Sequence, residues 1–300
     1  MKKFNFILVF VVFLNFSFFS LEASSLNGEL KIELSGDSIK QGETLTVFAS
    51  SPRRLKQIEL TFLGKKTPLF RVWNKKQDHL FRGFLGIPVY AKTGKRKLVV
   101  SGIDMKGQKV SGIIFLKIRS SRFKVQHIKL SKKKTRLLNY KILQKESRIL
   151  GKLLKKRSPK VYFASNFVTP VKGRISSEFG LRRKYNGGEI SSHHKGLDIA
   201  NRTGTPIYAA NGGHVVLAIR WKSHGKSVLI DHGHGIFTIY IHMHRIHVKK
   251  GQWVKKGALI GRVGSTGIAT GPHLHFGLSV NDVRVDPLPW LQGKVKLHFN

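Results

Sequence analysis

One short stretch near the C-terminus constrains the fold of this chain more than any other. Residues 265–272 contain two glycines and end in Pro272, so a regular helix or strand is not expected there. The next four residues are His273-Leu274-His275-Phe276. In a β-strand, the side chains of residues i and i+2 point to the same face. His273 and His275 are therefore predicted to lie side by side on one surface of a sheet, directly after an irregular loop.

A second cluster of the same character lies upstream, at His194-Lys195-Gly196-Leu197-Asp198. One aspartate and two histidines offer three nitrogen and oxygen ligands. A catalytic zinc ion takes such a set and leaves its fourth position for water or substrate. The alternative is two unrelated histidine pairs, because the chain contains 14 histidines. Spacing alone leaves both interpretations open.

Length and composition fit a chain of roughly two domains. There are 300 residues, and 41% of them are apolar, which is enough for hydrophobic cores. The chain has no cysteine. This excludes disulfides, thiolate metal sites, cysteine nucleophiles and a lipoprotein anchor.

Residues 1–23 are predicted to be a secretory signal peptide. Lys2 and Lys3 give a positive start, an almost uninterrupted apolar run extends from Phe4 to Phe19, and Ala23 ends the segment with a small residue. An uncleaved membrane anchor is the alternative, although the run is shorter than the ~20 residues that cross a bilayer. We therefore expect an exported protein, located in the periplasm or cell envelope.

The formal net charge of +40 is extreme. Such a charge indicates either nucleic acid or another anionic surface as a partner. Export removes nucleic acid from the expected partners, and the lysines are not interleaved with aromatic residues as in a base-stacking platform. We expect a solvated basic surface that adheres to the anionic envelope. No pattern in the sequence indicates an oligomeric state.

Residues 28–120 are predicted to form a small β-sandwich similar to an immunoglobulin domain. Residues 28–34 alternate strictly between polar and apolar, and 58–63 and 112–118 combine alternation with β-branched residues. Turn signals separate about seven such candidates, a number typical of a sandwich. No catalytic chemistry is evident in this region, so we expect it to position the rest of the chain.

Residues 122–160 differ sharply in composition from the regions on either side. They contain 15 lysines and arginines and a single acid, Glu146. Apolar residues recur near helical spacing, which predicts a basic amphipathic helix from about 138 to 157. Such a helix can lie on an anionic membrane. We favour the alternative, a connecting helix that packs against a neighbouring domain.

Residues 165–290 are rich in glycine and in short strand-like segments. Turn glycines separate these segments, and no helical pattern of useful length is present. The region is predicted to be a mostly antiparallel sheet whose concave face carries the histidines. Residues 291–300 form a basic tail.

A series of motifs in this region resembles a known family. In chain order they are Ser176-Ser177-Glu178-Phe179-Gly180-Leu181-Arg182, His194-x-Gly196-x-Asp198, Gly204-Thr205-Pro206, Tyr240-x-His242-Met243, Gly261-x-Val263-Gly264-Ser265-Thr266-Gly267 and Thr270-Gly271-Pro272-His273-Leu274-His275-Phe276. In this order they are similar to the lysostaphin-like, or LytM-type, zinc metallopeptidases that cut peptidoglycan. The resemblance covers roughly residues 165–290. More weakly, the preceding sandwich and helix resemble the N-terminal half of exported two-domain members.

The resemblance implies a fold and a set of functional residues. The fold class is mainly β, with a duplicated-hybrid-motif-like peptidase domain after the sandwich and the basic connecting helix. One Zn²⁺ per chain would be held by His194, Asp198 and His275. His242 and His273 match the family's catalytic pair. The implied substrate is a stem-peptide cross-link of peptidoglycan, and the direct D-Ala to diaminopimelate link suits an exported two-domain form.

The residue chemistry agrees with this reading. No His-Glu-x-x-His segment is present, so the glutamate base of many zinc peptidases is missing. Histidine titrates near ~6.5 and can act either as the base or as the partner of a developing oxyanion. Which role belongs to His242 and which to His273 stays open.

Two other functions remain as alternatives. One is a catalytically inactive LytM-type activator of a wall amidase, and the other is a basic envelope-binding protein. The first is disfavoured because all three ligand residues and both catalytic histidines are present. Among the remaining histidines, His232 and His234 flank Gly233 in an expected turn and are predicted to be surface residues.

Overall fold

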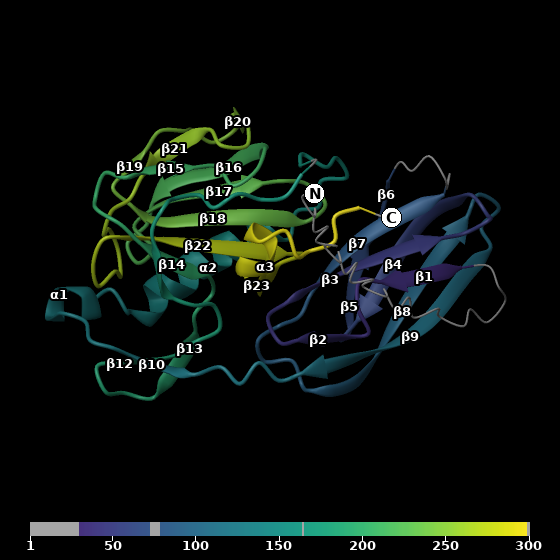
Figure 1. The fold of residues 1–300 in the computed structure, drawn as a ribbon, viewed down its shortest axis with the longest axis horizontal. Helices are drawn as coiled ribbons and strands as arrows, with labels where there is room; N and C mark the ends of the chain where they lie inside the picture. The colour runs from purple at the N-terminus through teal and green to yellow at the C-terminus, as the bar shows by residue number, and fades with distance from the viewer. Residues whose placement is uncertain (1–29, 73–78, 164, 299–300) are drawn as a thin grey trace, which may run out of the picture.

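Period-2 alternation dominates this sequence, and the structure is mainly β, as predicted. The computed structural model describes residues 30–72, 79–163 and 165–298. The predicted signal peptide lies outside the described residues. The strands form two lobes, an N-terminal one and a C-terminal one, and the last described segment of the chain runs back from the second lobe to the first (Figure 1).

Two sheets form the N-terminal lobe. The first has the strand order β1-β3-β7-β6 and is antiparallel. The second has the order β2-β9-β8-β4-β5, in which only β2 and β9 are parallel. The strands are β1 (Lys31–Leu34), β2 (Ser38–Lys40), β3 (Thr44–Ser50), β4 (Leu55–Phe62), β5 (Lys65–Pro68), β6 (Phe70–Arg71), β7 (Leu80–Gly86), β8 (Gly94–Asp104) and β9 (Lys109–Arg119).

Both sheets contribute side chains to one buried hydrophobic cluster. Strand β9 alternates between buried and exposed positions, so that Ile114 and Leu116 point into this cluster. At Gly112 of the same strand, a Cβ atom would lie 2.7 Å from Cδ1 of Ile32 in the other sheet. The two sheets therefore approach each other closely at a position where only glycine fits without displacing Ile32.

The basic segment between the lobes adds a strand to the C-terminal lobe. Its strand β10 (Val125–Ile128) pairs in parallel with β12 (Arg182–Tyr185), which pairs with β13 (Ile190–His193). The short helix α1 (Lys132–Thr135) follows. Four residues of alternation within a lysine-rich run are too short a signal to predict β10 from the sequence.

The amphipathic helix is present as α2 (Tyr140–Leu154), close to the predicted range of 138–157. Asn139 is its N-cap, and its side chain accepts a hydrogen bond from the backbone N–H of Ile142 at 3.3 Å. The apolar stripe of α2 packs against the C-terminal sheet, and its fully buried leucine, Leu154, contributes about 1.5–3 kcal/mol. Among the described residues, no helix combines the length and the hydropathy that crossing a bilayer requires.

The single acid of the basic segment fixes α2 to a loop of the C-terminal lobe. The buried carboxylate of Glu146 accepts hydrogen bonds from the backbone N–H groups of Lys222 and Ser223 and lies 2.5 Å from Nδ1 of His224. Burial alone raises the pKa of Glu146, but the hydrogen bonds from His224 and Ser223 outweigh it and lower the pKa to about 2. The helix is therefore held by a polar anchor as well as by its leucines.

The C-terminal lobe is built on one long antiparallel sheet. Its order is β11-β14-β22-β18-β17-β16-β20, with β23 also paired to β22, and a smaller sheet has the order β15-β21-β19. The elements are β11 (Arg174–Ser177), β14 (Leu197–Ala200), β15 (Pro206–Tyr208), β16 (Gly213–Arg220), β17 (Lys226–Asp231), β18 (Ile236–Met243), β19 (Arg245–Ile246), β20 (Trp253–Val254), β21 (Leu259–Arg262), β22 (His273–Val280), β23 (Val283–Val285) and α3 (Leu288–Leu291).

Helix α2 covers the same face of the long sheet that carries His275. In the pairing of β18 with β22, Ile241 is directly opposite His275, and Ile239 is opposite Gly277. Directly opposed residues share a face of a sheet. The leucines of α2 pack on an apolar strip of β17 and β18, which consists of Leu229, Phe237, Ile239 and Ile241. The histidine face is thus divided between this helix-covered strip and the positions on β14 and β22.

The two lobes share part of their core. Phe84 of β7 belongs to the hydrophobic cluster of the C-terminal lobe, with its ring 5.4 Å from that of Trp290. The side chain of Asn281 donates a hydrogen bond to the carbonyl of Phe84 at 2.7 Å. In the C-terminal segment, Val295 and Leu297 are buried in the same cluster. The described part of the predicted basic tail, residues 291–298, is therefore an ordered segment that contributes side chains to the core.

Candidate metal centre and active site

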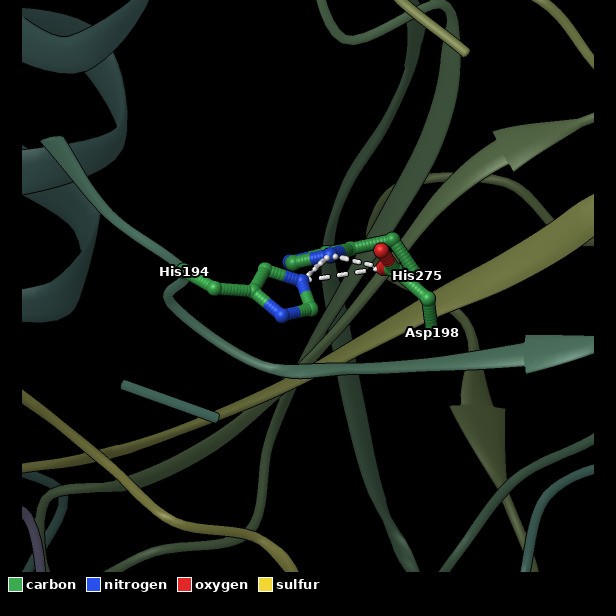
Figure 2. A group of neighbouring side chains, drawn as sticks. All are labelled: His194, Asp198 and His275. Atoms are coloured by element: carbon green, nitrogen blue, oxygen red, sulfur yellow. Dashed lines mark hydrogen bonds and ion pairs between the residues drawn. The ribbon is translucent and has the colours of Figure 1, made fainter. Parts of the chain in front are cut away.

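Three predicted site residues meet at one point in the structure. His194 follows β13, Asp198 lies in β14 and His275 lies in β22, where the antiparallel register places it directly opposite Asp198. Nε2 of His194 lies 3.0 Å from both Oδ1 of Asp198 and Nδ1 of His275, and the latter two atoms are 2.8 Å apart (Figure 2). In the described part of the chain, these three residues form a group whose ligand atoms lie close enough together to hold a metal ion.

The glycine between His194 and Asp198 is required for steric reasons. A Cβ atom on Gly196 would lie 2.4 Å from the carbonyl oxygen of Phe276 and 2.9 Å from Nε2 of His275. Any side chain at this position would push the segment away from β22. Glycine is therefore what allows His194 and Asp198 to reach His275 from opposite ends of one short turn.

Neighbouring groups orient two of the three side chains. Nδ1 of His194 lies 2.6 Å from the carbonyl oxygen of Glu178, so this nitrogen carries the proton and Nε2 presents its lone pair to the centre. Nη2 of Arg183 donates to Oδ2 of Asp198 at 2.8 Å, which leaves Oδ1 turned toward the histidines. Arg183 was not predicted from the sequence, because the motif that begins at Ser176 ends one residue earlier, at Arg182.

Burial and hydrogen bonding set the protonation states of the centre. Burial lowers the pKa of His194, and it lowers the pKa of His275 to about 3. Burial alone raises the pKa of Asp198, but its contacts with the imidazoles of His194 and His275 outweigh burial and hold this pKa well below its usual range. At neutral pH the group thus consists of two neutral imidazoles and one carboxylate, which are the forms that bind metal ions.

His242 reaches the site through a bulge in β18. The register between β17 and β18 shifts between Tyr240 and Met243, a span that includes this residue, and the backbone of His242 has a φ of 66°. A bulge re-aims the side chain that follows it. Simple alternation would place His242 on the face opposite Ile241, yet its ring lies 4.9 Å from that of His273 and 6.1 Å from that of His275.

The paired histidines present equivalent nitrogen atoms. Nδ1 of His242 lies 2.7 Å from the carbonyl oxygen of Thr266, and Nδ1 of His273 lies 2.9 Å from that of Gly271. Each Nδ1 therefore carries the proton, and each Nε2 is left with a lone pair. Nε2 of His273 is 3.7 Å from Oδ1 of Asp198. The structure brings all five predicted site residues together.

Four of the remaining histidines lie in three kinds of environment. His244 is exposed, and His224 pairs with Glu146. The prediction that His232 and His234 lie on the surface is wrong, because they are 0% and 3% exposed. Their turn folds inward beneath the segment near Pro159, whose carbonyl oxygen lies 2.9 Å from Nε2 of His234. A glycine-flanked turn indicates a tight bend but not whether another segment covers it.

Comparison with known proteins identifies the C-terminal lobe. Residues 192–287, which include all five site residues, match the model of peptidase family M23. This lobe belongs to peptidase family M23. The prediction of a LytM-type peptidase domain is thereby confirmed.

Named relatives match the M23 domain over part of their length. Peptidoglycan DD-endopeptidase ShyA of Vibrio cholerae is 44% identical over 109 residues, which are 36% of this chain and 25% of that protein. DD-carboxypeptidase/endopeptidase Mpg of Neisseria meningitidis is 38% identical over 115 residues, 38% of this chain and 26% of that protein. The chain thus spans about a quarter of the length of these curated relatives.

One solved structure is similar over both lobes. A crystal structure of a putative peptidase M23 from Pseudomonas aeruginosa is 27% identical, with a TM-score of 0.62, and the match covers 84% of this chain and 93% of that one. The arrangement of an N-terminal β lobe before an M23 domain is therefore shared with another protein.

Proposed function

We propose that this protein is an exported, zinc-dependent endopeptidase that hydrolyses peptide cross-links of peptidoglycan. The proposed bond is the direct D-Ala to diaminopimelate link. The names of the relatives support the substrate, since ShyA is a peptidoglycan DD-endopeptidase and Mpg a DD-carboxypeptidase/endopeptidase. The proposed location is the periplasm or cell envelope, where this substrate occurs.

The observation that carries the proposal is the convergence of three acceptor atoms. With Nδ1 of His194 protonated and Asp198 ionised, Nε2 of His194 and Oδ1 of Asp198 both present lone pairs toward Nδ1 of His275. In the tautomer of His275 that carries its proton on Nε2, Nδ1 is a third acceptor, and three such atoms within 3.0 Å of one another repel unless a cation lies among them. Ligand atoms around a tetrahedral zinc with bonds of about 2.0–2.1 Å lie about 3.3 Å apart, so a small outward shift fits the ion.

His194, Asp198 and His275 would hold the ion, and His242 and His273 would handle protons. A bound zinc ion would polarise a scissile carbonyl and lower the pKa of a water molecule to about 7. The free Nε2 of His242 or His273 can take the proton from that water and later deliver it to the leaving amine. The other imidazole can stabilise the developing oxyanion, while Arg183 keeps Asp198 oriented.

The test combines metal analysis with product analysis. Protein purified without chelator should contain close to one zinc per chain, and it should split purified muropeptide dimers that contain the D-Ala to diaminopimelate link. Chelation should abolish the cleavage, and added zinc should restore it. Cleavage of pentaglycine bridges but not of direct cross-links would overturn the proposed bond. If the purified protein instead contains no zinc and stimulates a wall amidase, the alternative of a catalytically inactive activator is supported.

A further inference from the structure

A cleft between the two lobes contains a partly buried guanidinium without a counter-charge. The cleft has a volume of about 760 Å³, within the range of ligand sites, and it extends from the N-terminal sheets to the segment that carries His194. Arg284 of β23 lines it and lies against Gly277, where a Cβ atom would come within 1.9 Å of Nη2. The guanidinium therefore occupies space that a side chain at residue 277 would otherwise fill.

The hydrogen bonds of Arg284 leave its charge uncompensated. Among the described residues, its one hydrogen bond runs from Nη2 to the carbonyl oxygen of Lys195, at 2.6 Å. Its Nε is buried and has no hydrogen-bond partner. Burial lowers the pKa of Arg284 to about 10, and no carboxylate of the described part of the chain offsets this effect. A charge that is partly removed from water is normally paired, so the absence of a carboxylate beside Arg284 favours an anion as the ligand of this cleft.

The other lining groups define what kind of anion would fit. Lys195 stands next to Arg284, and the one acid among the described lining residues, Asp282, already pairs with Lys65. The remaining wall is largely apolar and includes Phe179 and Val283. An anionic ligand here must therefore bring both a small negative group and an apolar or extended chain. A flat lipid surface cannot enter a cleft enclosed by two lobes, whereas a peptide can.

We propose that this cleft binds a carboxylate of the peptide substrate through Arg284 and Lys195. This inference rests on the proposed function, because the cleft opens beside His194 and its occupant would be continuous with the peptide at the metal centre. Arg284 is the better anchor, since a planar guanidinium forms directed hydrogen bonds with a carboxylate. Arg284 and Lys195 would thus make the enzyme select stem peptides with a free carboxylate over amidated ones.

The experiment compares two substrates on the full-length, zinc-loaded protein. One is a muropeptide dimer with free diaminopimelate carboxylates, and the other is the same dimer with those groups amidated. In the unaltered protein, KM should be about 10–100-fold lower for the free acid, the range for a charge-assisted contact. Arg284→Gln should remove this difference by raising KM for the free acid, with kcat and zinc content unchanged. Arg284→Lys should restore part of the selectivity.

Two further variants separate a binding role from a structural one. Lys195→Gln changes an exposed side chain and should reduce the selectivity without altering the thermal transition. Lys250→Gln removes one positive charge from an exposed turn outside the cleft and should leave the selectivity intact. Equal KM values for both dimers in the unaltered protein would overturn the proposal, as would selectivity that survives both Arg284→Gln and Lys195→Gln.

A binding measurement distinguishes this proposal from the proposed function. Calorimetry on the chelator-treated protein gives dissociation constants for the two dimers in the absence of turnover. Preferential, Arg284-dependent binding of the free acid by a protein that cleaves neither dimer would support the cleft and reject the peptidase. If the protein cleaves both dimers and binds them with equal affinity, the peptidase function is supported and the carboxylate site in the cleft is rejected. Arg284-dependent binding to anionic lipid vesicles, with no binding of either dimer, would assign the cleft to a different class of partner and overturn the proposal.

Discussion

The C-terminal lobe buries two groups of histidines, and they differ in where their nitrogen atoms point. In the metal group, His194 and His275 direct nitrogen atoms at each other and at Asp198. In the second group, His232 places Nδ1 2.6 Å from the carbonyl oxygen of Gly212 and Nε2 2.7 Å from Oγ1 of Thr238. Each nitrogen of His232 therefore has its own partner, and none is left for a ligand.

The acids beside the two groups show the same contrast. Oδ1 of Asp198 faces imidazole nitrogens, whereas Oδ1 of Asp231 accepts a hydrogen bond from the backbone N–H of Gly233 at 2.8 Å. Burial, a neighbouring acid and a glycine-rich turn are common to both groups. The convergence of unshared lone pairs distinguishes them, and this property depends on strand register. The comparison predicts that metal-dependent effects will be confined to the first group.

The largest expected effect is loss of the metal. Asp198→Ala removes the carboxylate that faces both histidines, so zinc content should fall from about one per chain to background, and peptidase activity should disappear with it. Asp231→Ala is the matched control in the second group and should retain zinc. Metal analysis of both purified variants checks this. Full zinc occupancy in Asp198→Ala would refute the ligand assignment.

The next effect separates catalysis from metal binding within the first group. His273→Ala and His242→Ala should lower turnover by about 10²–10⁴-fold while zinc stays bound, because acid–base and oxyanion groups contribute on that scale. His275→Ala should lose zinc and activity together. His244→Ala, at an exposed position, serves as the control. Loss of zinc from His273→Ala as complete as that from His275→Ala would make His273 a ligand.

In the second group we expect an effect of pH on stability. Burial lowers the pKa of His232 to about 4 from an unfolded value of 6.5, so the unfolded chain takes up this proton first as the pH falls. The stability that depends on neutral His232 is complete above about pH 6.5 and is lost between there and about pH 4. The difference corresponds to about 3 kcal/mol.

Denaturant titrations of zinc-free protein across this pH range measure that loss. His232→Gln cannot titrate, so its free energy of unfolding should fall less steeply with decreasing pH than that of the unaltered protein. Identical slopes for the two proteins would show that His232 is not the group responsible.

The smallest expected effect concerns Arg183, whose hydrogen bond orients the carboxylate of Asp198 in the metal group. Arg183→Gln frees Oδ2 of Asp198, and loss of such an orienting contact typically weakens metal affinity by about 10–100-fold. Competition with a fluorescent zinc chelator measures the change. Arg182→Gln alters the adjacent arginine, which instead donates to the carbonyl of Phe123, and should leave the affinity unchanged.

The sequence predicted the local features of this molecule better than its long-range ones. Alternation identified β9 and β22, and amphipathic spacing identified α2, because each pattern is contained within a few consecutive residues. The five site residues followed from motif order. Strand β10 was missed because its partner, β12, lies far along the chain.

The unpredicted parts of the site depend on contacts that no local pattern encodes. Arg183 reaches Asp198 because β12 and β13 form a hairpin beside β14, and His232 is buried because a distant segment covers its turn. The position of His242 depends on a bulge, which alternation alone does not indicate. Long-range packing therefore determines which polar side chains meet.

The apolar strip under α2 has a consequence for how this domain can vary among relatives. Leu229, Phe237, Ile239 and Ile241 lie on the histidine face and are covered only because the helix precedes the domain in the same chain. An M23 domain expressed alone from this sequence, starting after α2, would expose that strip to water and should self-associate. Relatives without such a helix should carry polar residues at these four positions, so the composition of the strip serves as a sequence marker for the helix.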